Sequence, residues 1–160
     1  MSTSKSNKLG HIELSFIKQP AESLYSFFLT TDNDQSEPLS LFVDLKEYAI
    51  KLTEKANIIY ALKSGKIVGI CAFYYNPSPS DSFLTLLLIS KSCRGNHLGK
   101  RLMEEMIQYC HSSQGIRLEV SETNLVALSL YKDLGFVIVD TQWNSKSNSL
   151  HLTMHLTTNG

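Results

Sequence analysis

Residues 89–100 read Ile-Ser-Lys-Ser-Cys-Arg-Gly-Asn-His-Leu-Gly-Lys, and this stretch is the most informative part of the chain. It joins the apolar run Phe83–Ile89 to a segment, Leu98 to about Ser112, in which apolar residues recur at helical spacing. The first N–H groups of a helix have no partner inside the helix, and the helix dipole is positive there. With glycine in the turn and Arg94 and Lys100 beside it, the turn predicts an anion site, and a pyrophosphate is the natural ligand.

Two other phosphate motifs fit these residues less well. A P-loop requires GxxxxGK followed by serine or threonine, whereas Gly95 and Gly99 are too close together and Arg101 follows Lys100. The dinucleotide fingerprint GxGxxG is absent. Taken alone, the segment is also compatible with a helix start that has a basic face and binds nothing.

The residues before the turn show strand and helix patterns. His11–Ile17 alternates apolar and polar residues, and Asp44 precedes an amphipathic stretch as its N-cap. Ser64-Gly65 separates two apolar runs, which is a hairpin signal, and Phe83–Ile89 suits a central strand covered on both faces. The predicted elements are strands at 11–17, 58–63, 66–75 and 83–89, helices at 20–29 and 44–56, and loops at 30–38 and 76–82.

Downstream of the turn, helices and strands continue to alternate. Helices are expected at 98–112 and 125–134, the second ended by Gly135, and strands at 116–120, 136–140 and 150–156. This order places one strand–helix–strand crossover at the centre, so the fold class is α/β, with a mixed α+β sheet. We expect a single domain over 9–158 and a disordered N-terminus over the polar residues 1–8.

Composition argues against several classes of protein. Lysine plus arginine equals aspartate plus glutamate at 15 each, so bulk charge gives no reason to bind nucleic acid or an anionic membrane. Residues 1–8 carry no apolar segment that could serve as a signal peptide or membrane span. The scattered Cys71, Cys93 and Cys110 form neither a disulfide framework nor a zinc motif, which is typical of a reduced, cytoplasmic protein.

The turn is followed by a second motif in the expected order. Leu118-Glu119-Val120 precedes a helical pattern that consists of Asn124, Ala127, Leu130, Tyr131, Gly135 and Phe136. The two segments resemble the GCN5-related N-acetyltransferase (GNAT) superfamily, whose motifs are Arg/Gln-x-x-Gly-x-Gly/Ala and L-x-V then N-x-x-A-x-x-L-Y-x-x-x-G-F. Arg94 and Gly99 match the ends of the first motif. His97 departs from it, because glycine is usual there; we expect a helical N-terminal conformation that needs no positive φ.

The resemblance, which covers roughly 58–139, implies a fold and a ligand. The GNAT fold has a central, mostly antiparallel sheet of about six to seven strands with flanking helices and a splay between the fourth and fifth strands. The ligand is acetyl-CoA as co-substrate, and no metal is required. By resemblance, the backbone of Leu87–Ile89 pairs with the pantetheine arm of the cofactor, and the turn at Arg94–Lys100 binds its pyrophosphate. The side chain of Asn124 can cap its helix, and by resemblance it also contacts the pantetheine arm. The residues are Leu87, Leu88, Ile89, Arg94, Gly95, Asn96, His97, Leu98, Gly99, Lys100 and Asn124.

Two catalytic residues are implied by the resemblance. Tyr131 stands where family members commonly use a general acid, and a phenol of pKa near 10 can donate a proton to a thiolate of pKa about 8.5. Glu119 stands in a run where relatives that modify protein N-terminal amines have their general base. Phe83–Ile89, where many relatives place the base, has no carboxylate, and Glu122 and Asp81 are weaker candidates. The alternatives are a packed tyrosine and a strand glutamate that is solvated or structurally hydrogen-bonded.

The predicted reaction is direct acetyl transfer to a primary amine in a ternary complex, with the carbonyl polarised by a backbone N–H near Ile89. The expected acceptor is a small metabolite, for example an amino sugar, and the alternative is a protein N-terminus or lysine. A non-catalytic acyl-CoA-binding domain and a nucleotide- or phosphate-binding module are the rival readings. The resemblance also allows a homodimer.

Histidines and acceptor-side residues are less informative. His151 and His155 lie about 13 Å apart by strand rise, too far for one metal ion, and are expected at the surface. The N-terminal half normally forms the acceptor side in this family. Its polar and acidic residues are too generic to decode: Tyr25, Tyr48, Tyr74, Tyr75, Asp32, Asp34 and Glu37.

Overall fold

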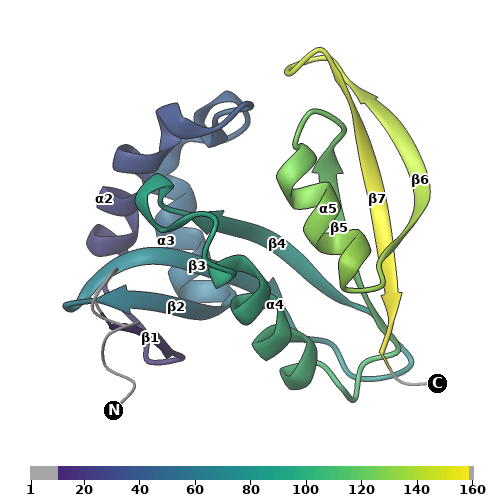
Figure 1. The fold of residues 1–160 in the computed structure, drawn as a ribbon, viewed down its shortest axis with the longest axis horizontal. Coiled ribbons are helices and arrows are strands. Elements are labelled where there is room, and N and C mark those ends of the chain that lie inside the picture. The colour runs from purple at the N-terminus through teal and green to yellow at the C-terminus, as the bar shows by residue number, and fades with distance from the viewer. Residues whose placement is uncertain (1–10, 159–160) are drawn as a thin grey trace.

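Strands and helices follow the predicted order in the computed structural model, which describes residues 11–158 (Figure 1). The strands are β1 (Ile12–Ser15), β2 (Asn57–Lys63), β3 (Lys66–Tyr74), β4 (Ser82–Ile89), β5 (Gly115–Ser121), β6 (Val137–Asn144) and β7 (Ser149–Thr157). The helices are α2 (Ala21–Thr31), α3 (Leu45–Lys55), α4 (Leu98–Tyr109) and α5 (Leu125–Asp133). Short 3₁₀ turns that the sequence did not predict are η1 (Asp32–Asp34), η2 (Leu39–Leu41) and η3 (Lys91–Cys93).

The strands form one sheet in the order β1-β2-β3-β4-β5-β7-β6. Neighbouring strands are antiparallel except β4 and β5, which are parallel and are joined through α4. These two strands pair only from Ser82 to Leu84, opposite Ile116 to Leu118, and then separate (Figure 1). Among the described strands, none pairs with the rest of β4 on that side. This confirms the predicted mixed, mostly antiparallel sheet and its splay.

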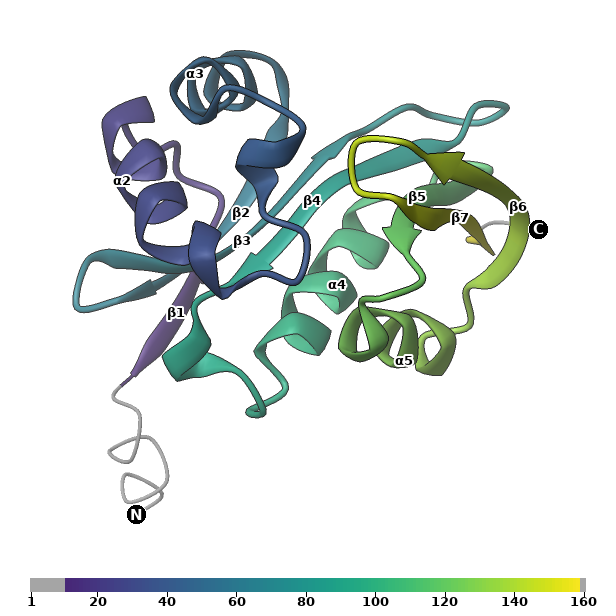
Figure 2. The same cartoon turned by 90° about the horizontal axis from the view of Figure 1, so that it is seen from above.

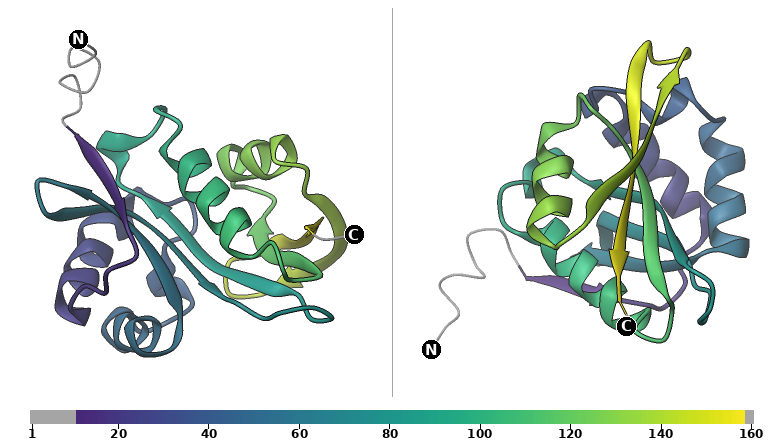
Figure 3. Two further views of the ribbon diagram at one scale, coloured as in Figure 1. Left: turned by 90° about the horizontal axis from the view of Figure 1, so that it is seen from below. Right: turned by 90° about the vertical axis from the view of Figure 1, so that its right-hand side faces the viewer.

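Helices cover both faces of this sheet. The helices α2 and α3 lie on one face, and α4 and α5 lie on the other (Figure 2, Figure 3). Successive residues of β2 serve both cores: Ile58 and Tyr60 pack with α2 and α3, whereas Ile59 and Ala61 pack with α4 and α5. Because both faces are covered, the central strands read as nearly unbroken apolar runs.

Caps and turns lie where the sequence predicts them. The Asp44 carboxylate accepts the Glu47 N–H at 2.9 Å and so caps α3. Ser64 and Gly65 have φ of 52° and 78°, the left-handed values of a tight hairpin turn, and Gly135 ends α5 with φ of 100°. The strand β6 extends past the predicted end at residue 140, because it stays paired with β7 as far as Asn144.

The predicted disordered segment, residues 1–8, lies outside the described residues. Within residues 11–158, no helix is both long enough and apolar enough to cross a membrane.

Candidate active site

The separation of β4 from β5 leaves two adjoining cavities in the middle of the sheet. The turn cavity, of about 660 Å³, lies between the turn at 94–100 and α5. The cleft cavity, of about 400 Å³, lies between β4, the end of β5, β7 and the connection from α2 to α3. Both cavities are lined by Gln35, Ser36, Leu87, Asn124 and Tyr131. Ligands in the two cavities would therefore meet at these side chains.

The start of α4 leaves main-chain donors without acceptors. Arg101 is the first residue whose N–H bonds back, to the His97 carbonyl at 3.0 Å. In the described part of the chain, the N–H groups of residues 95–100 have no hydrogen-bond acceptor. Gly95 has φ of 79°, and apart from its two chain neighbours no described residue has an atom within 4 Å of a Cβ built on it, so its backbone is open to a ligand. Free donors at the positive end of a helix dipole suit a pyrophosphate.

His97 adopts a left-handed conformation, with φ of 61° and ψ of 18°, at the N-cap of α4. The sequence-based expectation that this position needs no positive φ was wrong, because both Gly95 and His97 turn the chain left-handedly into the helix. Its side chain makes no capping hydrogen bond. For a residue other than glycine, this conformation costs about 1–2 kcal/mol of folding free energy, which explains why glycine is usual at this position of the motif.

Most of the predicted cofactor residues line the turn cavity. Leu88 instead lines the cleft cavity, and Asn96 lines neither, since its side-chain amide donates to the Arg94 carbonyl at 3.1 Å. Arg94 Nε donates to the Ile89 carbonyl at 3.2 Å and ties the turn to the end of β4. The predicted residues around the cavity are Leu87, Ile89, Arg94, Gly95, His97, Leu98, Gly99, Lys100 and Asn124.

The free edge of β4 presents backbone groups where β5 has separated from it. Ser90 N–H donates to the Val68 carbonyl of β3 at 2.8 Å. Because N–H groups alternate in direction along a strand, those of Leu87 and Ile89 point to the opposite, unpaired edge. This edge can form hydrogen bonds with the amide groups of an extended ligand, as it would with a neighbouring strand.

Tyr131, in the last turn of α5, lies where the two cavities meet. Its side chain is buried, and its ring packs against Phe136 with centroids 5.8 Å apart. Burial raises the pKa of the phenol well above its usual value, so the hydroxyl stays protonated at neutral pH. Asn124 caps the same helix by accepting the Ala127 N–H at 3.2 Å, which confirms the predicted cap.

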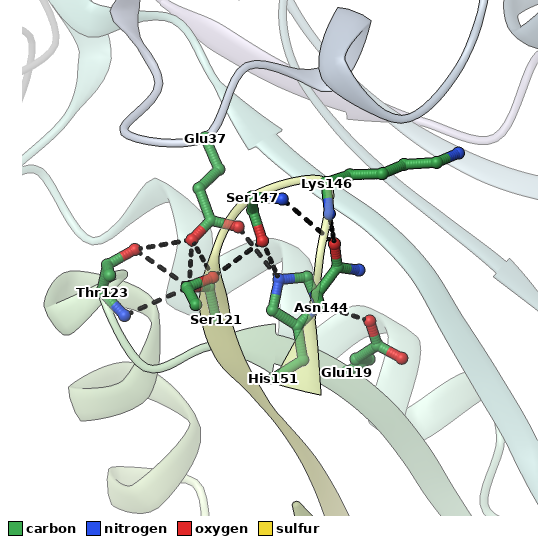
Figure 4. A network of polar contacts seen from close by, with 9 residues as sticks. Glu37, Glu119, Ser121, Thr123, Asn144, Lys146, Ser147 and His151 are labelled. Atoms are coloured by element: carbon green, nitrogen blue, oxygen red, sulfur yellow. Dashed lines mark hydrogen bonds and ion pairs between the residues drawn. The ribbon is translucent and has the colours of Figure 1, made fainter. Parts of the chain in front are cut away.

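Glu119 lines the cleft cavity together with His151 of β7. Glu119 Oε2 lies 2.7 Å from His151 Nδ1, and Glu37 Oε1 lies 3.0 Å from His151 Nε2 (Figure 4). Ionised carboxylates only accept hydrogen bonds, so both ring nitrogens carry protons and His151 is an imidazolium. Burial alone would lower the pKa of His151, but the bonds to the two carboxylates outweigh it and raise the pKa. The prediction of a surface histidine was wrong, because this side chain is only 11% exposed.

Glu37, between η1 and η2, is the centre of this cluster (Figure 4). Its Oε2 accepts hydrogen bonds from the hydroxyls of Ser121, of Thr123 at 3.0 Å and of Ser149 at 2.7 Å. Burial would raise the pKa of Glu37, but these bonds and that of His151 lower it to about 2. We call Glu37, Glu119, Ser121, Thr123, Ser149 and His151 the Glu37 network. It fastens the α2–α3 connection to β5 and β7, and sequence patterns gave no sign of it.

The weaker candidates for a general base lie outside both cavities. Asp81 pairs with Arg117 Nε at 2.9 Å and with His155 Nε2 at 3.3 Å, and Glu122 is exposed. The three cysteines are free and buried. Over residues 11–158, no three His, Cys, Asp or Glu side chains are placed to hold a metal ion.

Solved structures share this fold at low sequence identity. The ribosomal-protein-S18-alanine N-acetyltransferase from Escherichia coli is 16% identical, with 94% of this chain and 96% of that chain covered and a TM-score of 0.75. Ard1 from Thermoplasma volcanium is 19% identical, with 92% and 97% covered and a TM-score of 0.76. A Bacillus anthracis protein in complex with acetyl coenzyme A is 24% identical, with 64% and 63% covered and a TM-score of 0.57.

A search among curated protein sequences gave no match. The family model described as Acetyltransferase (GNAT) family matches residues 19–136, which is more than half of the chain. The matched span includes β4, the turn, α4, β5 and α5, and so all the elements around the turn cavity. The chain therefore belongs to the GNAT acetyltransferase family and is an acyltransferase that uses acetyl-CoA as its co-substrate.

Proposed function

We propose that this protein transfers the acetyl group of acetyl-CoA directly to a primary amine of a small metabolite, in a ternary complex. The observation that carries the proposal is the meeting of the two cavities at Leu87, Asn124 and Tyr131. The donor occupies the turn cavity and the acceptor occupies the cleft cavity, so binding alone brings the reacting groups together. A cleft cavity of about 400 Å³ is within the size range of small-molecule sites.

On the donor side, the chain supplies backbone groups and positive charge. The free N–H groups of residues 95–100, together with Arg94 and Lys100, suit the pyrophosphate. The unpaired edge of β4 suits the amides of the pantetheine arm. The Ile89 N–H, which points to this edge, is proposed to polarise the thioester carbonyl.

On the acceptor side, Glu119 is the proposed general base. An alkylammonium of pKa near 10 must lose a proton before its nitrogen can attack the thioester. The Glu119 side chain is 57% exposed in the cleft, and its Oε1 accepts no hydrogen bond from the described residues. This oxygen is free to take the proton, directly or through a water. His151 holds the other oxygen and so fixes the direction of the carboxylate.

Tyr131 is the proposed hydrogen-bond donor to the leaving thiolate. A neutral hydroxyl at the junction can stabilise the negative charge that develops on sulfur. This role differs from the general acid that the resemblance implies, because burial raises the pKa of the phenol still further above the thiol value of about 8.5 and makes complete transfer of its proton more unfavourable. The proton released by the amine therefore completes the thiol, and Tyr131 ends the cycle unchanged.

A protein N-terminal amine is the second candidate acceptor. It is favoured by the structural likeness to the Escherichia coli ribosomal-protein-S18-alanine N-acetyltransferase and by the Leu118-Glu119-Val120 run. A domain that binds acyl-CoA without transferring the group is the rival from another class. It would use the turn cavity but not the free oxygen of Glu119.

Release of CoA, followed with a thiol reagent over a panel of primary amines and short peptides, tests the proposal. We expect release that Glu119→Gln lowers at least about tenfold with unchanged acetyl-CoA affinity in calorimetry, whereas Glu122→Gln, outside both cavities, has no effect. Acetyl-CoA binding without release for any acceptor would assign the chain to the non-catalytic class.

A further inference from the structure

We infer that the acceptor is a primary amine attached to an apolar, uncharged group, and that an acidic group beside the amine prevents binding. The inference rests on the proposed function, because it takes the cleft cavity as the acceptor site. It narrows that function from primary amines in general to one chemical class.

The walls of the cleft cavity are mostly apolar. They come from β4, the end of β5 and the connection that contains η2. An acceptor with an apolar body would lose contact with water against these walls, which favours binding in proportion to the area covered. The apolar lining side chains are Leu39, Phe42, Val43, Phe83, Leu84, Leu86, Leu87, Leu88 and Val120.

The charged side chains of this cavity favour a cation. Among the described residues, the lining contains Glu37, Glu119 and His151 but no lysine or arginine. Two carboxylates bonded to one imidazolium leave a net negative charge, and Lys146 on the nearby hairpin extends away from the cluster (Figure 4). An ammonium is therefore attracted, whereas a carboxylate or phosphate finds no free cationic partner in this lining, because both ring nitrogens of His151 are bonded to Glu119 and Glu37, and is repelled.

Several polar side chains in the lining already have hydrogen-bond partners within the protein. The Tyr48 hydroxyl is bonded to Thr85 Oγ1 at 3.0 Å, and the Ser121 hydroxyl is bonded to Glu37. The Gln35 amide donates to the Thr31 carbonyl at 3.4 Å. A sugar ring placed here would leave several hydroxyls without partners, which is unfavourable. The lining thus points away from the amino sugar that the sequence suggested.

Two sources present the favoured chemistry: a small apolar amine, and the first residue of a peptide, whose own carboxyl is tied up in an amide. The shared feature is an apolar group without an anion beside the amine. One set of amines therefore tests which groups beside the amine are accepted, and a comparison of a peptide with a small amine tests which of the two acceptors is preferred.

Isoamylamine, leucinamide and leucine test the chemistry, because they share an alkyl group and differ beside the amine. Glucosamine serves as the hydroxyl-rich comparison. Each kcat/KM from CoA release is measured over the same range of pH, and the maxima of the pH profiles are compared, because the amine pKa values differ. We expect isoamylamine and leucinamide to exceed both leucine and glucosamine by at least about tenfold. A leucine-initiated peptide that exceeds isoamylamine assigns the source to a peptide, and the reverse assigns it to a small amine.

Phe83, which is 40% exposed on β4, allows a cation to be added without disturbing the core. Phe83→Arg should raise kcat/KM for leucine relative to leucinamide about fivefold, because a guanidinium pairs with a carboxylate. Phe83→Met is neutral and similar in size, and it should leave this ratio unchanged. Thermal stabilisation by acetyl-CoA checks that both variants are folded.

The outcomes separate the inference from the function on which it rests. If leucine or glucosamine matches leucinamide, the inference is overturned while acetyl transfer stands. If no amine or peptide releases CoA although acetyl-CoA binds, the proposed function fails and the inference fails with it.

Discussion

The turn at 94–100 and the Glu37 network are built in opposite ways. The turn consists of consecutive residues, and its donors are free because a helix begins there. The network joins side chains that are far apart in the chain, with 84 positions between Glu37 and Ser121 and 114 between Glu37 and His151. The proposed donor side is therefore encoded by neighbouring residues, whereas the proposed acceptor side depends on tertiary contacts. Substitutions in the turn should therefore change the affinity for acetyl-CoA, whereas substitutions in the Glu37 network should change the stability of the fold.

The largest effect is expected at Tyr131, where the two cavities meet. Tyr131→Phe removes only the hydroxyl and should lower kcat about 100-fold, because the thiolate loses its hydrogen-bond donor. Steady-state CoA release measures kcat, and calorimetry should show unchanged acetyl-CoA affinity. Equal losses of kcat and affinity would mean that the hydroxyl acts in donor binding.

Glu37→Gln should destabilise the fold by about 2 kcal/mol, because a nearly buried carboxylate loses its charge-assisted bonds while their donors stay in place. In a chain of this size the melting temperature should fall by about 4–8 °C. Glu54→Gln, an exposed change on α3, is the matched control and should shift it little. A change no larger than that of the control would show that the network does not support the fold.

Gly95→Val should weaken acetyl-CoA binding about tenfold, because a β-branched residue is strained at φ of 79° and its side chain approaches the donors of the turn. Gly65→Val is the control, since Gly65 has φ of 78° but lies in the β2–β3 hairpin. Both variants should lose stability, but calorimetry should show weaker acetyl-CoA binding for Gly95→Val alone. Equal affinities would remove Gly95 from the pyrophosphate site.

The network should also give stability a pH dependence. The pKa of Glu37 is about 2 in the fold and 4.5 ordinarily, so its contribution is present above about 4.5 and is lost as pH falls toward 2. The fold raises the pKa of His151, so its contribution is fully present below about 6.5 and is lost as pH rises through the raised pKa. The melting-temperature difference between wild type and Glu37→Gln should therefore be largest between about pH 4.5 and 6.5. A difference that stays constant across pH would contradict this assignment.

The smallest effect belongs to the turn. His97→Gly should stabilise the protein by about 0.5 kcal/mol, because relief of the left-handed conformation slightly exceeds the entropy that glycine gains on unfolding. Asn96→Gly, at a neighbouring position without positive φ, should destabilise it by a similar amount. Denaturant midpoints measure both changes, and a stabilised Asn96→Gly would contradict the argument.

Elements whose signals are short-range were predicted well. The Asp44 cap, the Ser64-Gly65 hairpin and the end of α5 at Gly135 depend on residues within a few positions, and the structure confirms all three. The 3₁₀ turns η1 and η2 were missed, because short loop segments adopt such turns according to what surrounds them. The left-handed φ of His97 was missed because positive φ is uncommon for residues other than glycine.

The sequence alone determined the turn that we propose as the donor half of the site, because a strand, a glycine turn and a helix start are consecutive and expose their N–H groups wherever they fold. Tertiary structure alone decided the proposed acceptor half. Glu119 and His151 lie on adjacent strands, β5 and β7, and Glu37 reaches them from a distant connection. Which side chains meet across such a distance depends on strand order and register, and local patterns do not carry that information.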